Sequence, residues 1–187
     1  MRLYDNKGLF EALKSGENVI PLFIFDTSIT DSLPANDARV HFIYNSIANI
    51  QRKLNKVKRS LWIYKGRPAE IFQQLAMQYP LVTVFTNQDH EPYGIKRDAE
   101  IRKILERQDI SFQYYLDHLL FEKDEVGKAD GTPYHVFTPY SKKCREILKV
   151  DHFEHFPSED YLQNLTTLKP PSFPTLSDLG CQPSKIH

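Results

Sequence analysis

Four polar residues follow one another closely between an apolar segment and a charged one: Asn87, Asp89, His90 and Glu91. Asp89 and Glu91 stand at alternate positions, so their carboxylates can point the same way and accept hydrogen bonds from N–H or O–H groups of a ligand. Catalysis by an acid–base pair also needs a substrate pocket, which nothing else in the sequence supplies. The alternative is an ordinary helix start, where the helix dipole favours acidic residues. We therefore predict a binding site or a capped helix, and no catalytic residue.

The neighbouring segments place these side chains at one edge of a sheet. Residues 81–86 (LVTVFT) have the apolar, β-branched character of a strand buried on both faces. In open α/β sheets, ligands bind beyond the carboxyl ends of such strands. Arg39 begins a long helix after the loop that follows another predicted strand, residues 19–25. We expect Arg39 either to lie across this mouth from Asp89 and Glu91 or to be an ordinary surface arginine.

Predicted strands alternate with predicted helices along the first 116 residues. The clearest helix spans residues 37–58, where apolar residues recur every three or four positions. The intervals between the strands are too long for hairpins, so the strands are parallel and joined by right-handed crossovers. The sequence therefore predicts an α/β fold with a doubly wound, Rossmann-like parallel sheet and helices on both faces. The strands are expected at residues 19–25, 61–64, 81–86 and 112–116, and the other helices at about 6–16, 68–79, 95–108 and 141–149.

Composition excludes several classes of protein. The 187 residues carry 24 Lys plus Arg and 24 Asp plus Glu, a balance that argues against a chain devoted to gripping phosphate backbones. Cys144 and Cys181 are far apart, and His152 and His155 fall in a proline-containing stretch, so we expect neither a disulfide framework nor a metal site. No G-x-G-x-x-G or P-loop motif is present. No apolar run approaches a membrane span, and we expect a cytoplasmic protein with no membrane partner.

Five motifs together resemble the N-terminal α/β domain of the DNA photolyase/cryptochrome family. They keep the family's order and spacing over about 150 residues: RLYDN, VIPLFIFD, ARVHF, TNQDHEPYGIKRD and GTPYHVFTPYSKK. PSFPTLSDLG, at residues 171–180, is similar to the connection to the family's second domain. The resemblance implies that residues 1–150 form an antenna domain, which holds a light-harvesting chromophore. Residues 151–187, whose composition is that of a linker, would lead toward a helical FAD-binding domain.

Two departures from the family pattern carry expectations of their own. The family begins with an apolar strand, central in the sheet, and Met1 stands inside the run that follows it. Unless residues precede Met1 in the natural protein, we expect two unpaired strand edges with an open cleft between them, and poor stability or self-association. The resemblance implies a helical domain that binds FAD and damaged DNA, and this domain is expected beyond these 187 residues. The fragment alone is therefore expected to be inactive as a deoxyribodipyrimidine photo-lyase.

The resemblance also bears on the chromophore. Members with a deazaflavin or FMN antenna have a D-x-E-P-Y segment and an arginine at the start of the long helix, which Asp89, Glu91 and Arg39 match. Folate-type members have Asn-Glu where this chain has Tyr93-Gly94, so folate is disfavoured; some members carry no antenna. The first hypothesis is the antenna domain of a blue-light photolyase that repairs pyrimidine dimers. The alternatives are a cryptochrome photoreceptor and a non-catalytic α/β nucleotide-binding module.

Overall fold

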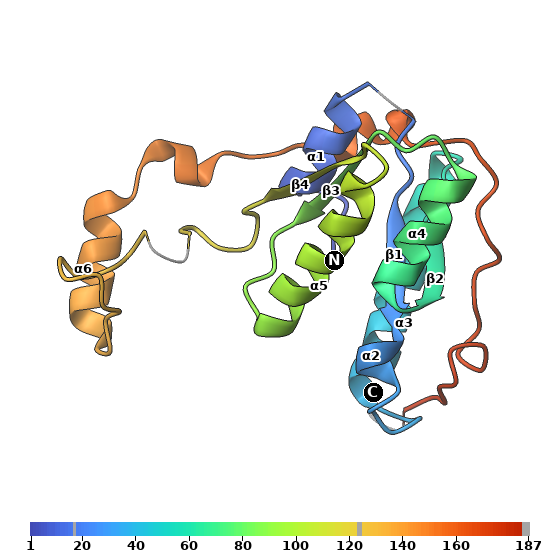
Figure 1. The fold of residues 1–187 in the computed structure, drawn as a ribbon, viewed down its shortest axis with the longest axis horizontal. Helices are drawn as coiled ribbons and strands as arrows, with labels where there is room; N and C mark the ends of the chain where they lie inside the picture. The colour runs from blue at the N-terminus through green and yellow to red at the C-terminus, as the bar shows by residue number, and fades with distance from the viewer. Residues whose placement is uncertain (17, 123–124, 185–187) are drawn as a thin grey trace.

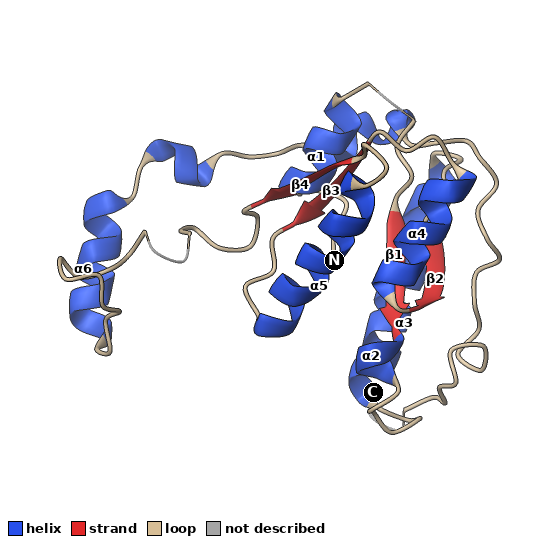
Figure 2. Ribbon diagram, viewed as in Figure 1, coloured by secondary structure: helices blue, strands red, loops and turns tan. Residues whose placement is uncertain are grey.

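Two pairs of parallel strands form the centre of the domain (Figures 1 and 2). The computed structural model describes residues 1–16, 18–122 and 125–184. One pair joins β1 (Leu22–Asp26) to β2 (Trp62–Gly66), with Leu22 opposite Trp62. The other joins β3 (Thr83–Asn87) to β4 (Ser111–Tyr115), with Thr83 opposite Ser111. The predicted α/β class and parallel strands are confirmed.

Helices cover both faces of these strands, as predicted. Alternate residues of β1 point to opposite faces, so Phe23 and Phe25 pack against α3 (Ala38–Lys56), whereas Leu22 and Ile24 pack against α4 (Pro68–Gln78). On the first face, α1 (Lys7–Lys14) joins α3 through the packing of Leu13 against Leu54. On the second face, α4 contacts α5 (Pro92–Glu106). Each pair of helices therefore forms one layer of a doubly wound domain.

Polar residues at the strand and loop ends determine where the helices begin. Asn6 caps α1 by accepting a hydrogen bond from the backbone N–H of Leu9 at 3.0 Å. Asp37 caps α3 in the same way, and Asp26 caps a short helix, α2 (Thr27–Thr30), inside a segment predicted to be a loop. Ser, Asp and Asn side chains satisfy the free N–H groups of a first helical turn, which is why helices start at these residues.

The helix α6 (Phe137–Ile147) corrects one prediction, because it begins four residues before the expected Ser141. The expected start was wrong because the aromatic segment VFTPY, residues 136–140, reads as a stop ahead of the helix, whereas the helix begins inside it. A proline in the first turn needs no N–H donor and is compatible with a helix. None of the residues of α6 is buried, and the helix lies apart from the strands (Figure 1).

The C-terminal segment returns to the strands and packs against them. It contains two short 3-10 helices, η1 (Val150–Phe153) and η2 (Ser158–Asn164). After η2, Leu165 is buried against α1 and α3 and forms a parallel bridge with Val19. Leu179 is buried in the cluster that contains Phe25. This segment therefore contributes side chains to both of the cores that α3 contacts.

The four strands do not form one sheet. β2 and β4 lie on the outside, and the inner edges of β1 and β3 face each other across a gap (Figure 2). Within the described ranges, no strand pairs with either inner edge. All five residues of β3 are only half-buried, although their sequence is typical of a fully buried strand. The predicted pair of unpaired edges is thus present.

Candidate functional site

Asp26 and Tyr93 connect the two strand pairs at their carboxyl edge. Asp26 is the last residue of β1 and is buried, and one of its carboxylate oxygens accepts a hydrogen bond from the backbone N–H of Ser28 at 2.9 Å. The Tyr93 hydroxyl, from the first turn of α5, donates a short hydrogen bond to the other oxygen. Partial burial of that hydroxyl, together with its bond to Asp26, raises the pKa of Tyr93. Tyr93 therefore acts as a neutral donor that positions α5 against β1.

Asp89 lies folded over the start of α5. Its carboxylate accepts a hydrogen bond from the backbone N–H of Glu91 at 3.0 Å and lies 3.6 Å from the guanidinium of Arg97. A Cβ atom at Gly94 would lie 2.2 Å from this carboxylate, so the close approach requires glycine at that position. The sequence placed Asp89 and Glu91 at the same edge, and the structure confirms that they stand together there. Asp89, however, is already engaged within the protein.

Glu91 differs from Asp89 in that its carboxylate has no partner among the described residues. It occupies the N-cap position of α5, yet its side chain makes no capping hydrogen bond. It is exposed, and within the described ranges its carboxylate contacts no cation or donor. Because Pro92 lacks an N–H group, the first turn of α5 presents N–H donors only from Tyr93 onward. This edge of the domain therefore offers one free carboxylate beside uncapped backbone donors.

Arg39 begins α3, as predicted, but contacts neither Asp89 nor Glu91. Its guanidinium instead forms a fork on the carboxylate of Asp37, with N–O distances of 3.0 and 2.7 Å. These hydrogen bonds lower the pKa of Asp37 to about 2. The Arg39 side chain is 71% exposed, so its outer face is open to solvent.

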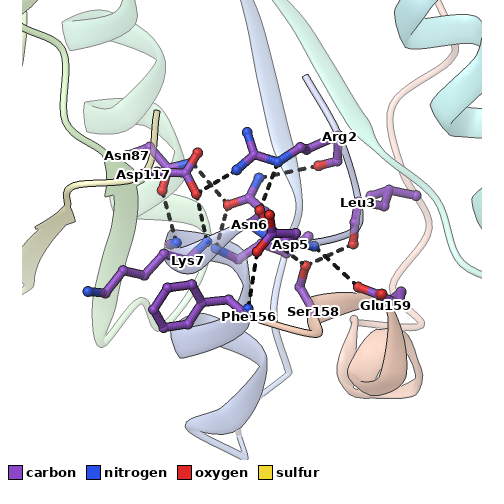
Figure 3. A network of polar contacts seen from close by, with 12 residues as sticks. Arg2, Leu3, Asp5, Asn6, Lys7, Asn87, Asp117, Phe156, Ser158 and Glu159 are labelled. Atoms are coloured by element: carbon purple, nitrogen blue, oxygen red, sulfur yellow. Dashed lines mark hydrogen bonds and ion pairs between the residues drawn. The ribbon is translucent and has the colours of Figure 1, made fainter. Parts of the chain in front are cut away.

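A polar network holds the segment ahead of α1 against the ends of β3 and β4 (Figure 3). Asn87 accepts a hydrogen bond from the Gly8 N–H at 2.9 Å and donates to Asn6 at 3.0 Å. Asp117 accepts one from the Arg2 guanidinium at 3.0 Å and one from the Lys7 N–H at 2.9 Å. Its side chain is only 4% exposed.

The same network reaches the C-terminal segment. The Ser158 hydroxyl donates to the Leu3 carbonyl at 2.9 Å, and the Phe156 N–H donates to the Asp5 carboxylate at 3.2 Å. In the first turn of α1, the backbone N–H groups are occupied by the side chains of Asp117, Asn87 and Asn6. This helix start is therefore closed to a phosphate, in contrast to the start of α5.

Two buried polar atoms near this edge, Gln88 Oε1 and His90 Nε2, have no hydrogen-bond partner among the residues that the structure describes. The His90 ring packs against that of His118, with 6.0 Å between centroids. Among the described residues, no group of three or more acidic, histidine or cysteine side chains is arranged to hold a metal ion.

The comparisons with known proteins agree with this architecture. The family model described as DNA photolyase matches residues 1–160, which is most of the chain. The chain belongs to the DNA photolyase family. It is 32% identical over 142 residues to a deoxyribodipyrimidine photo-lyase of Synechococcus sp., covering 76% of this chain and 29% of that protein. It is 24% identical over 178 residues to cryptochrome-1 of Sylvia borin, covering 83% of this chain and 29% of that one.

Two solved structures of photolyase-family proteins share the fold. An archaeal photolyase from Sulfolobus tokodaii, described with two FAD molecules and a novel light-harvesting cofactor, has a TM-score of 0.66 at 27% identity, over 79% of this chain and 33% of that one. A cryptochrome from Synechocystis sp. has a TM-score of 0.73 at 21% identity, over 92% and 38%. The chain thus spans about a third of the length of these relatives, and it corresponds to the N-terminal domain of the photolyase family. Among the helices of the described ranges, none has the length and apolar character that a membrane crossing requires.

Sequence reasoning missed two parts of this candidate site. Asp26 ends the apolar run VIPLFIFD, and an acidic residue at the end of a buried strand was a signal that could have marked it. The network around Asp117 had no such signal, because its partners come from both ends of the chain.

Proposed function

We propose that this photolyase-family domain binds a light-harvesting chromophore, a deazaflavin or FMN, beside the start of α5. The observation that supports the proposal is the Glu91 carboxylate, which has no partner in the described part of the chain and stands beside an uncapped first helical turn. A chromophore bound here absorbs light and passes the excitation on. The proposal extends to the longer protein, in which a helical domain binds FAD and repairs pyrimidine dimers in DNA. On this proposal, the 187 residues alone are inactive.

The chemistry of the site fits the pyrimidine edge of a flavin-type ring. That edge presents an N–H group between two carbonyl oxygens, so it needs one acceptor with donors beside it. The Glu91 carboxylate supplies an acceptor, and the first-turn N–H groups of α5 supply donors whose partial positive charge suits a carbonyl oxygen. Asp89 has a positioning role in the proposal, since it holds the Glu91 backbone and is itself held by Arg97.

Arg39 is the proposed contact for the opposite side of the chromophore. Asp37 holds its guanidinium in a fixed plane, and the exposed face of that plane can stack on an aromatic ring or pair with the phosphate of FMN. A deazaflavin without a phosphate would use only the stacking face. Folate is disfavoured on the sequence of the Tyr93–Gly94 pair, and Gly94 leaves no room for a larger side chain next to Asp89.

An absorption and fluorescence titration tests the proposal. We expect FMN or a deazaflavin to produce a saturable, red-shifted band, and folate to produce a weaker response. The variant E91Q should weaken binding by about 10- to 100-fold, because a hydrogen bond to a charged group contributes about 1.5–3 kcal/mol. E100A, which removes an exposed carboxylate farther along α5, is the matched control and should bind like the parent. Equal affinities of the parent and E91Q would refute the assignment of Glu91.

The second candidate is the N-terminal domain of a cryptochrome that signals instead of repairing DNA. Cryptochromes are among the relatives of this chain, but its identity to the photo-lyase is 32% against 24% to the cryptochrome, which favours the first. An assay of pyrimidine-dimer repair under blue light, made with the full-length protein, decides between the two candidates. Repair favours the photolyase, and its absence favours the cryptochrome. A nucleotide-binding module is disfavoured by the occupied start of α1.

A further inference from the structure

We propose that the outer edge of β4 is a dimer interface, at which β4 pairs antiparallel with β4 of a second copy of this chain. β4 lies on the outside of its strand pair (Figure 2). The Ser111 N–H donates to the Val82 carbonyl at 2.9 Å, and every second residue of a parallel ladder faces the same neighbour, so odd-numbered residues of β4 face β3. The backbones of Phe112 and Tyr114 therefore point outward, and within the described ranges no strand pairs with them.

The outer edge of β4 lacks the features that keep exposed strands apart. Residues 110–116 (ISFQYYL) contain no charged residue, proline or glycine, and the register with β3 runs without a bulge. Natural edge strands are usually protected by lysines, prolines, bulges or a covering segment. The outer edge of β2 has such protection, because it carries Lys65 and a Cβ atom at Gly180 of the C-terminal segment would lie 3.5 Å from the Lys65 Nζ. β4 is therefore the outer edge that is open to pairing.

A shallow groove beside this edge has opposite charges at its two ends. It lies at the far end of α5 from the candidate chromophore site, and Arg102, Glu106 and Asp109 line it. The Arg102 guanidinium lies over the rings of Phe112 and Tyr114, 5.7 and 4.8 Å from their centroids, so the positive charge is nearer the end of the strand. Glu106 and Asp109 stand just ahead of the start of the strand. None of the three charged side chains has a salt-bridge partner in the part of the chain that the structure describes.

This order of charges identifies the occupant as a second copy. An antiparallel neighbour runs in the opposite direction, so the positive end of each groove lies beside the negative end of the other. When Gln113 of both copies lies at the twofold axis, the outward backbone groups of Phe112 pair with those of Tyr114 in the second copy. The same rotation brings Arg102 of each copy toward the acidic end of the other groove. The edge is thus self-complementary in hydrogen bonding and in charge, as a twofold interface requires.

Hydrogen exchange at several protein concentrations tests the proposal on the full chain. Sedimentation equilibrium over about 10 μM to 1 mM should show a monomer converting to a dimer, because one strand pair and two helix ends make a small, weak interface. Where the dimer predominates, the amides of Phe112 and Tyr114 should exchange about tenfold more slowly. The amides of Gln113 and Tyr115 face β3, so they are internal references and should change little. A monomer's mass throughout this range, or protection of the inner edges of β1 and β3 in place of these two amides, would overturn the proposal.

Charge variants test the register of the interface. Q113K places two lysines opposite each other at the twofold axis and should weaken dimerisation about tenfold or more. Q74K makes the same change at an exposed position of α4, so this matched control should dimerise like the parent. R102E should weaken dimerisation about tenfold, and R102E/E106R, which exchanges the two charges, should restore it. Unchanged dimerisation of Q113K, or no recovery in the double variant, would overturn the proposal.

Urea unfolding shows whether each variant is folded before its mass is measured. Gln113 is exposed, so Q113K keeps the test decisive if R102E does not fold.

Discussion

Replacement of Asp117 by alanine should destabilise the domain strongly, although this residue lies in a loop. The substitution leaves the part-buried Lys7 N–H without an acceptor, which costs about 1–3 kcal/mol. It also removes the ion pair with Arg2, which we discount to about 1 kcal/mol because the Arg2 side chain is 32% exposed. The sum is a loss of about 2–4 kcal/mol in the free energy of unfolding.

Urea unfolding followed by circular dichroism measures this loss. At a slope of about 2 kcal/mol per molar, the midpoint should fall by about 1–2 M. The variant D117N keeps an acceptor for Lys7 and loses only the charge, so its loss should be smaller. A double-mutant cycle with R2A then isolates the ion pair. A D117A protein within about 0.5 kcal/mol of the parent would refute the idea that this network holds the start of α1.

Three further predictions concern the candidate site. G94A should lower the free energy of unfolding, measured in urea, by about 1–3 kcal/mol, because the new Cβ would lie 2.7 Å or less from the side chain of Asp89. Glycine-to-alanine changes inside helices ordinarily stabilise, so a gain in stability would contradict this contact. R39A should raise the pKa of Asp37 from about 2 toward its ordinary 3.8, which carbon NMR measures. In the parent, the contribution of this carboxylate to stability is present above pH 3.8 and is lost as the pH falls through 2. Tyr93 should titrate above its ordinary pKa of 10.0, because partial burial of its hydroxyl and a bond to a carboxylate favour the neutral form. Its contribution to stability is present below pH 10 and is lost at higher pH. An NMR titration midpoint at or below 10 would contradict the bond.

The elements of this domain could be predicted because their signals are local. Apolar residues that recur every three or four positions predicted α3, with an end within two residues of the observed one. The β-branched run around Val84 predicted β3. The same local reasoning placed Asp89 and Glu91 at the carboxyl edge of the strands. It misplaced the start of α6, since the segment VFTPY, residues 136–140, reads as a stop although its proline is also compatible with a first helical turn.

The contacts that shape the site could not be predicted, because they join distant parts of the chain. Tyr93 reaches Asp26 across 67 residues, and Asn87 reaches Asn6 across 81. A pattern of apolar and polar residues indicates which face of an element is buried, but not which side chain of another element meets it. The pairing of Arg39 with Asp37 shows the same limit at short range, since the sequence allowed two orientations for this arginine.

Leu179 has a consequence for the order in which the domain is built. The cluster of Phe25, Ile47 and Ile63 is complete only when Leu179 packs into it. A ribosome adds about 5–20 residues per second, so the 116 residues that follow Ile63 up to and including Leu179 take roughly 6–23 s to synthesise. During that time the cluster around β1 and β2 is open on the side that Leu179 later covers. The nascent chain therefore exposes an apolar surface for far longer than a helix or strand takes to form, and chaperones that bind such surfaces have time to act on it.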